Sequence, residues 1–205
     1  MLARIGHAAF TCRTAEDAAI LLNVLATPEM SQSEFKADYL SAFGTTKHPK
    51  IGVVKNFKAT DEVRTAFLEA VKSFHSLGST HEMDVPFESA SFNIKNIEQD
   101  RETISQTLFK DIDVLLLPTT TDSTPTIEEA KAQGSQAVSA DNTFFCNYYG
   151  LPAISIPCGF SKNGLPSGLQ IVGPRWGEGN ILDIANTFQQ VTQWHLKHPK
   201  SDTSG

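Results

Sequence analysis

Short apolar runs bounded by glycine, proline or polar residues recur along the chain and predict buried strands. Four of these runs suit strands that pack on both faces, at positions 51–54, 114–118, 153–156 and 168–172. A fifth run, 81–85, ends at Pro86 and also suits a strand. The predicted sheet therefore takes its strands from most of the chain.

Between these runs, apolar residues recur every three or four positions, which is the spacing of an amphipathic helix. The first helix follows Thr14, which is spaced from Asp17 as in a capping box; its expected inward face is Ala15, Ala18, Leu21, Leu22 and Leu25. A second helix follows the expected cap Thr60 and ends at Gly78. Further helices are expected around 97–108, from Thr126 to Ala132 and over 178–194.

The order of these elements predicts an α/β fold. The strand at 51–54, the helix after it and the strand at 81–85 form a β-α-β unit, whose two strands pack in parallel. The last two strands are joined through Asn163-Gly164, a pair that tolerates the positive φ angles of a tight turn, so they pair antiparallel. We therefore expect a mixed, mostly parallel sheet flanked by helices on both faces.

The net charge of the chain bears on which kinds of partner it could bind. Its 205 residues carry a formal net charge of −6, without a basic stripe for phosphate groups. This argues against nucleic acid or an anionic membrane as the main partner, and no run approaches a membrane span. An odd number of cysteines, Cys12, Cys146 and Cys158, indicates free thiols in a reducing compartment, so a cytoplasmic location is expected.

Two pairs of histidines are candidates for a metal site. His75 with His81 lies near Asp84, and His195 with His198 has helical spacing, but neither pair makes a recognised zinc pattern. Surface histidines explain both pairs better, so no metal and no cofactor is expected. Cys158 is expected to be a buried, inert thiol rather than a nucleophile.

The stretch around the last two strands reads GLPAISIPCGF and then GLPSGLQIVG, from Gly150 to Gly173. It resembles the C-terminal signature of the amidase signature family, the Lys–Ser–Ser serine amidases. Asp113 to Thr119 and His7 to Ala26 also resemble family segments, although Ala9 and Phe10 stand where the family has Gly-Pro. The resemblance implies the C-terminal half of the family fold, with a partial amidase signature domain at 1–197 and a disordered tail at 198–205.

The catalytic lysine, the bridging serine and the Gly-Gly-Ser-Ser loop of the family have no counterpart in this sequence. The resemblance therefore implies the C-terminal part of an amidase, a fragment or truncated product that hydrolyses no amide alone. In the complete enzyme, the Lys–Ser–Ser groups would cleave the carbon–nitrogen bond of a small amide without a cofactor. The alternative is a non-catalytic subunit or pseudoenzyme that binds an amide, or that pairs with a separate catalytic chain.

By resemblance to fatty acid amide hydrolase, a member of the family, Thr143 and Cys146 match positions that line the acyl-chain pocket. Plain packing is the alternative for both. Asp141 lies one position away from an acidic residue that the amidotransferase members use, and it is expected to be a solvated loop carboxylate. No catalytic residue is assigned within the chain.

The resemblance also implies that strands adjoining this half of the sheet lie outside the chain. Their absence would leave an apolar edge and face uncovered. We therefore expect the chain alone to self-associate or to be poorly stable, and a homo-oligomer or a separate catalytic chain is a possible partner.

Overall fold

The computed structural model describes residues 6–26, 38–87 and 92–198. Its centre is one five-stranded sheet in the order β2-β1-β3-β5-β4. The strands are β1 (Lys50–Val54), β2 (Ser79–Met83), β3 (Val114–Pro118), β4 (Ala153–Phe160) and β5 (Pro166–Val172). Of the expected C-terminal tail, residues 198–205, His198 is described and the rest lies outside the described residues.

The sheet is mixed, as the sequence predicts. β1 pairs in parallel with both β2 and β3, whereas β5 pairs antiparallel with both β3 and β4. The β-α-β unit is thus confirmed, but the expectation of a mostly parallel sheet is wrong, because the two kinds of pairing are equally frequent. The predicted strand at 81–85 lies two residues earlier, since Ser79 pairs with Lys50 and Met83 with Val54.

The antiparallel hairpin of β4 and β5 is confirmed and is longer than predicted. Pro157 does not end β4, because the ladder continues past it through a β-bulge between Pro157 and Gly159. The turn closes with a 2.9 Å hydrogen bond from the Gly164 amide to the Ser161 carbonyl. Of the two turn residues Asn163 and Gly164, only Gly164 adopts a positive φ, of 76°. Asn163 therefore does not need the left-handed conformation expected of it.

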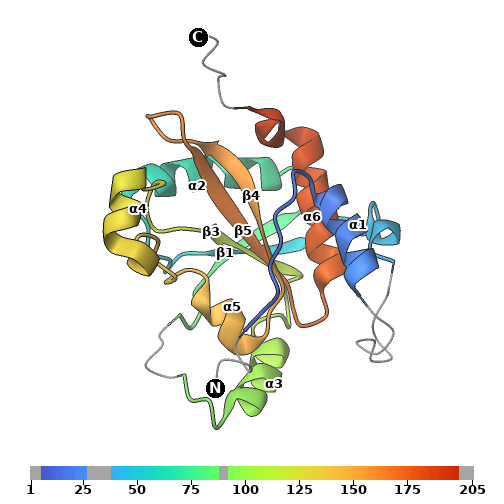
Figure 1. The fold of residues 1–205 in the computed structure, drawn as a ribbon. Coiled ribbons are helices and arrows are strands. Elements are labelled where there is room, and N and C mark those ends of the chain that lie inside the picture. Colours follow the sequence, from blue (N-terminus) through green and yellow to red (C-terminus); the bar gives the residue numbers. More distant parts are fainter. Residues whose placement is uncertain (1–5, 27–37, 88–91, 199–205) are drawn as a thin grey trace.

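Two long helices cover one face of the sheet (Figure 1). They are α2 (Asp61–Phe74) and α6 (Glu178–Val191), and a Cβ added at Gly159 of β4 would contact Ala66 of α2 at 3.4 Å. The rings of Phe74 and Phe188 stack between these helices with centroids 4.8 Å apart. Trp194 lies beyond α6, in the short 3-10 helix η6 (Trp194–Leu196), so the last helix is shorter than predicted.

Helix α1 (Ala15–Leu25) packs on the outside of α6. The predicted capping box is present, with Thr14 and Asp17 bonded to each other's backbone amides. The expected inward face is correct for Ala15 and Ala18 but wrong for Leu25, which is 51% exposed. None of the described helices has the length and apolar character needed to cross a membrane.

The segment 38–46, which includes η3 (Leu40–Ala42), is bound to α6 by a buried carboxylate. Asp183, 1% exposed, accepts hydrogen bonds from the backbone amides of Gly44 (2.7 Å) and Thr46 (2.8 Å). These two bonds offset part of the cost of burying the polar side chain. These bonds attach the segment to the helical layer.

The opposite face of the sheet carries a helix that the sequence analysis missed, α5 (Phe144–Tyr149). Helix α3 (Ile97–Thr107) packs against α5. Arg101 of α3 donates hydrogen bonds to the carbonyls of Tyr148 (2.8 Å) and Asn147 (3.2 Å) at the end of α5. The cation thus satisfies carbonyl groups that a helix end leaves free.

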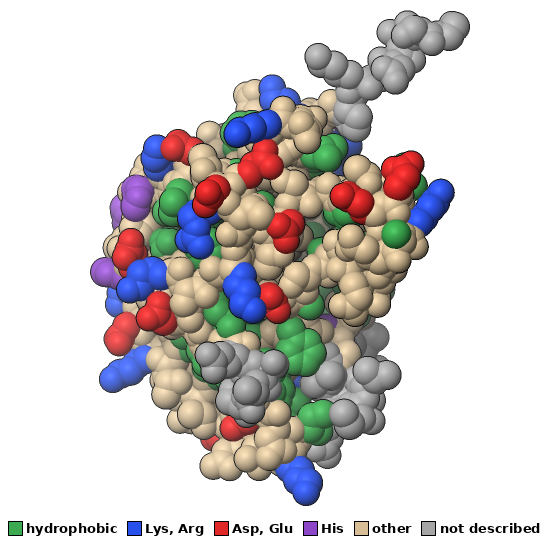
Figure 2. All heavy atoms as spheres, turned by 90° about the vertical axis from the view of Figure 1, so that its left-hand side faces the viewer, with side chains coloured by type: hydrophobic (Ala, Val, Ile, Leu, Met, Phe, Trp, Pro, Cys, Tyr) green, Lys and Arg blue, Asp and Glu red, His purple; other side chains and the backbone are tan. Residues whose placement is uncertain are grey.

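The segment that connects β3 to α5 contains α4 (Ile127–Gln133) and η5 (Gly134–Gln136). Thr126 caps α4 in the predicted position, through a capping box with Glu129. The side of the molecule that carries α4 is shown in Figure 2, where acidic and basic side chains are interspersed. The described part of this side therefore has no basic patch.

Candidate functional site

Polar side chains gather on the α5 side of the sheet, where β3 ends. The register of the hairpin places Ser155 of β4 opposite Gln170 of β5, and Gln170 opposite Leu117 of β3. These side chains point away from α2, because Gly159 after the bulge faces α2 together with the other row of residues. Ligands of α/β sheets usually bind near the carboxyl ends of the parallel strands, so this region is the candidate site.

The centre of the candidate site is a pair of hydroxyl groups. Thr119 Oγ1, just beyond β3, lies 2.6 Å from Ser155 Oγ on β4. Gly168 lies beneath the pair, and a Cβ there would come within 2.9 Å of both oxygens. Glycine at position 168 therefore allows the two hydroxyl groups to meet.

A buried amide network lies beside this hydroxyl pair. Gln170 Nε2 donates a 3.0 Å hydrogen bond to the Asn142 carbonyl. The Asn142 side chain bonds the backbone of Lys58 twice, accepting from its amide (3.2 Å) and donating to its carbonyl (2.8 Å). Since Gln170 is 4% and Asn142 1% exposed, these bonds are shielded from water. They join β5, the loop after β1 and the start of α5.

The two residues predicted to bind substrate lie at the start of α5, three positions apart, one just before the helix and one within it. Thr143 occupies the position before the helix, next to Asn142, and its hydroxyl donates to the Ala140 carbonyl (3.3 Å). Cys146 is 6% exposed, and burial raises the pKa of its thiol far above the ordinary value. Thr143 therefore borders the candidate site, while Cys146 packs in the core. Their role in binding stays a prediction.

Asp141 is exposed, as the sequence analysis expects of a solvated carboxylate. Its Oδ2 lies 3.1 Å from Lys58 Nζ, and both side chains are about half or more exposed (49% and 73%). An ion pair at the surface contributes little free energy. Its position next to Asn142 places both charges at the rim of the site.

The hydroxyl pair can bind a polar group, but to act as a nucleophile it would need a partner that activates it. Within the residues that the structure describes, neither hydroxyl group is hydrogen-bonded to a lysine, histidine or carboxylate side chain. A serine nucleophile needs such a base. The pair is thus suited to donate and accept hydrogen bonds with a neutral ligand such as an amide.

The described histidines, cysteines and carboxylates do not gather in groups of three or more that could hold a metal ion. His75 Nδ1 instead shares a 2.9 Å hydrogen bond with Thr80 Oγ1. The three cysteines are free thiols. Burial raises the pKa of Cys158 to about 12, which agrees with an inert thiol.

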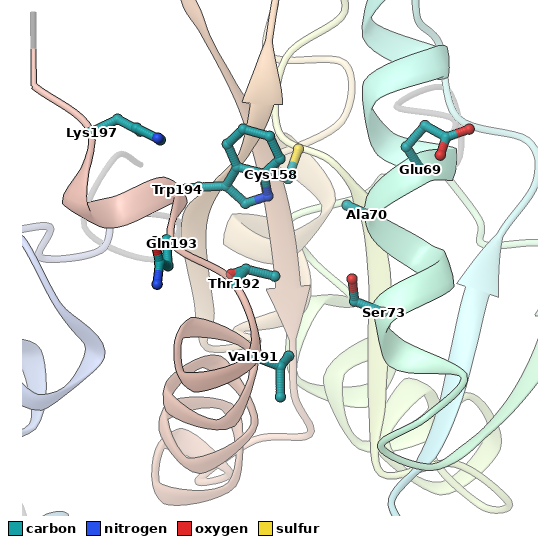
Figure 3. Close-up of a pocket in the computed structure, with 9 residues that line it drawn as sticks. All are labelled: Glu69, Ala70, Ser73, Cys158, Val191, Thr192, Gln193, Trp194 and Lys197. Atoms are coloured by element: carbon teal, nitrogen blue, oxygen red, sulfur yellow. The ribbon is translucent and has the colours of Figure 1, made fainter.

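A separate hollow of about 450 Å³ lies on the helical face, between α2 and the chain that follows α6 (Figure 3). Cys158 forms its floor, and Ala70, Ser73, Val191 and Trp194 are among its walls. Because Cys158 faces α2, the sheet separates this hollow from the hydroxyl pair. It is therefore not part of the candidate site.

Thr119 and Ser155 were not singled out from the sequence. A threonine directly after an apolar strand and a serine inside one are weak signals on their own. They become a pair only through the antiparallel register of β5, which lies between them. Gln170 lies within the stretch that carries the family resemblance, but its bond to Asn142 depends on the same register.

The comparisons with known proteins agree on one family. The sequence model described as Amidase matches residues 89–182, which include Thr119, Asn142, Ser155 and Gln170. The A subunit of glutamyl-tRNA(Gln) amidotransferase from Halothermothrix orenii is 43% identical over 51% of this chain and 21% of that protein. Its counterpart from Prochlorococcus marinus is 32% identical over 74% of this chain and 33% of that protein.

Solved structures share the fold at lower identity. The structure of 6-aminohexanoate cyclic dimer hydrolase matches with a TM-score of 0.73 and 20% identity, over 91% of this chain and 55% of that one. The A subunit of the Thermotoga maritima glutamyl-tRNA(Gln) amidotransferase matches with a TM-score of 0.68 and 22% identity, over 88% and 52%. The chain thus spans about a fifth to a third of these curated relatives, and about half of the solved chains. It belongs to the amidase signature family, as a chain that spans part of the length of its relatives.

Proposed function

We propose that these 205 residues are the C-terminal part of an amidase that hydrolyses the carbon–nitrogen bond of a small amide. The catalytic lysine and the two serines lie outside the chain. In the complete enzyme, the serine oxygen attacks the amide carbonyl, the lysine and second serine pass the proton to the departing amine, and water releases the acid. The chain described here supplies one wall of the substrate site.

The observation that carries this proposal is the extent of the fold match. Nine-tenths of the chain follows the fold of 6-aminohexanoate cyclic dimer hydrolase, and the remainder of that hydrolase has no counterpart here. The residues on this side of the site are suited to binding, since Thr119 and Ser155 can hydrogen-bond a neutral amide, and no described residue is bonded to them as a base. Thr143 at the start of α5 extends the same wall.

The proposed substrate is a small amide. The similar proteins include a 6-aminohexanoate cyclic dimer hydrolase, an aryl acylamidase and a peptide amidase, whose names differ in substrate. The three free thiols support a cytoplasmic location as part of the proposal. No cofactor is required by this chemistry.

A fluorophosphonate probe, which labels activated serines, tests where the nucleophile lies. The chain alone is expected to remain unlabelled and to release no amine from a panel of small amides. The DNA upstream of the Met1 codon is expected to encode, in frame, a lysine followed by a Gly-Gly-Ser-Ser loop. Labelling of one serine within the 205 residues would show that the proposed division of the site is wrong.

A second candidate is a subunit or pseudoenzyme that binds an amide without cleaving it, or that pairs with a separate catalytic chain. The hydroxyl pair favours it, because within residues 6–26, 38–87 and 92–198 no base is bonded to either hydroxyl group. A stop codon upstream of Met1, together with co-purification of a chain that carries the glycine-serine loop, would select pairing. Amide binding measured by calorimetry, with neither labelling nor a partner, would select the pseudoenzyme.

A further inference from the structure

Residues 124–140 form an arm that leaves the sheet beside the hydroxyl pair and returns beside it. The arm begins a few residues after Thr119 and ends just before Asn142 and Thr143. It contains α4 and η5 and stands at one side of the sheet (Figure 1). Both of its ends thus belong to the rim of the candidate site.

The arm is weakly attached to the rest of the protein. None of the seven residues of α4 is buried, and the main packing partner of α4 is η5, within the arm itself. Ile127 is 69% exposed and Val138 51% exposed, so these apolar side chains of the arm face solvent. Segments with few buried contacts open at low free-energy cost.

The arm nevertheless has internal order. The Thr126 hydroxyl accepts from the Glu129 amide (3.2 Å), and the Glu129 carboxylate accepts from the Thr126 amide (2.8 Å). These bonds hold the first turn of α4 without help from the sheet. The arm would therefore keep this turn if it moved.

The two ends of the arm are fixed by buried or charged groups. At the first end, the Thr60 amide donates to the Thr121 carbonyl (2.8 Å), and Ser123 Oγ donates to Glu62 Oε2 (2.7 Å). At the second end, Gln170 and Lys58 hold Asn142. Any motion of the arm would therefore be confined to the residues between these anchors.

A single glycine joins α4 to η5. Gly134 has φ 54° and ψ −125°, a conformation that residues with a Cβ avoid, and a Cβ there would meet no atom within 4 Å. Its requirement for glycine is therefore conformational and does not come from packing. The backbone conformation of Gly134 therefore sets the direction in which the chain leaves α4.

We propose that residues 124–140 are a movable arm that closes over the Thr119–Ser155 hydroxyl pair. Closure would bring the exposed apolar side chains of the arm over the site and exclude water from the ligand. This proposal rests on the proposed function only for the class of ligand, an amide. The movement itself belongs to this chain.

Distances between pairs of nitroxide labels measure the movement directly. One label replaces Lys131 on α4 and the other Ala153, an exposed residue on the Ser155 side of β4, in a Cys12→Ser background. The matched control moves the first label to Lys72 on α2, an exposed lysine on a helix that is packed against the sheet.

The Lys131–Ala153 distribution is expected to be at least about twice as broad as the control, with a second maximum at shorter distance. A single distribution as narrow as the control would overturn the proposal. Gly134→Ala is expected to shift the Lys131–Ala153 distances, whereas Gly164→Ala, at an equally open positive-φ glycine of the hairpin, leaves them unchanged. Equal effects of the two variants would also count against the arm. Neither measurement depends on fluorophosphonate labelling, so failure of the arm and failure of the amidase proposal are distinguishable.

Discussion

The side-chain amide of Gln170 donates its hydrogen bond to the backbone carbonyl of Asn142 across 3.0 Å, and both residues are almost fully buried. The side chain of Asn142 is in turn hydrogen-bonded to the backbone of Lys58. One interior amide therefore connects the sheet, the start of α5 and the loop after β1. Thr143, the residue before α5, follows Asn142 directly in the chain.

Replacing Gln170 by alanine is expected to lower the free energy of unfolding by about 1–3 kcal/mol, because the Asn142 carbonyl loses its partner inside the core. Urea denaturation followed by circular dichroism measures the change. Gln193→Ala, at an exposed position, serves as the control and should change stability by less than about 0.5 kcal/mol. Equal losses in the two variants would show that the bond contributes nothing specific.

The carboxylate of Glu62 connects α2 to two loops. It accepts hydrogen bonds from the Lys162 amide (2.6 Å) and from Ser123 Oγ (2.7 Å), and these bonds, the first most strongly, lower the pKa of the carboxyl. A pKa that is lower in the folded state means that the stabilisation is complete above the unfolded pKa, about 4.3 for glutamate, and is lost as pH falls through the folded value.

Glu62→Gln is therefore expected to reduce stability at pH 7 and to have a smaller effect at pH 3, where the wild-type carboxyl approaches protonation. Thermal unfolding at the two pH values gives the comparison. Glu102→Gln, an exposed residue of α3, is the control and should show no such difference. A Glu62→Gln effect that is the same at both pH values would contradict the role of the carboxylate charge.

Gly168→Ala places a methyl group 2.9 Å from each oxygen of the hydroxyl pair, so the two side chains must separate. Overpacking of this kind costs about 1–3 kcal/mol. In a protein of this size, each kcal/mol lowers the melting temperature by about 2–4 °C. Gly159→Ala is the control, because its methyl group would make ordinary contact with Ala66 at 3.4 Å.

The Gly168→Ala loss is expected to be smaller in a Ser155→Gly background, where one of the two oxygens is absent. A double-mutant cycle on thermal stability measures this coupling. Strictly additive losses would mean that the added methyl group acts elsewhere than at the hydroxyl pair.

The chain alone is expected to self-associate through the free edge of β4, where Ala153 and Phe160 are exposed. A lysine at an exposed edge position opposes strand pairing, so Ala153→Lys should shift the mass measured by light scattering after size exclusion towards the monomer. Ser79→Lys on β2, the other edge of the sheet, is the control and should leave the mass unchanged. A monodisperse wild-type monomer with an ordinary cooperative melting transition would contradict this expectation.

Local signals in the sequence were sufficient for most elements. The capping box at Thr14, the helix start at Thr126, the buried run at β3 and the turn at Gly164 are all present at the predicted positions. Thr60 occupies the predicted cap position of α2, although its side chain makes no capping bond and its amide pairs with Thr121 instead. Such signals are reliable because each depends on residues a few positions apart.

The missed features depend on contacts between distant segments. Helix α5 has only six residues, four of them buried, so it shows no amphipathic period. Pro157 was expected to end its strand, but β4 is an edge strand with a bulge, where proline is tolerated. The hydroxyl pair requires both the β3–β5 and the β4–β5 register, which no local pattern records.

The strand order also determines when each part of the sheet can be completed during synthesis. β1 and β2 can pair once α2 has been made, but β3 has only β1 as a neighbour until β5, late in the chain, is available. The wholly apolar strand from Val114 to Leu117 is therefore half-covered while much of the remaining chain is still being made. Long-range pairing of this kind slows folding, and this central strand is the segment that chaperones would protect.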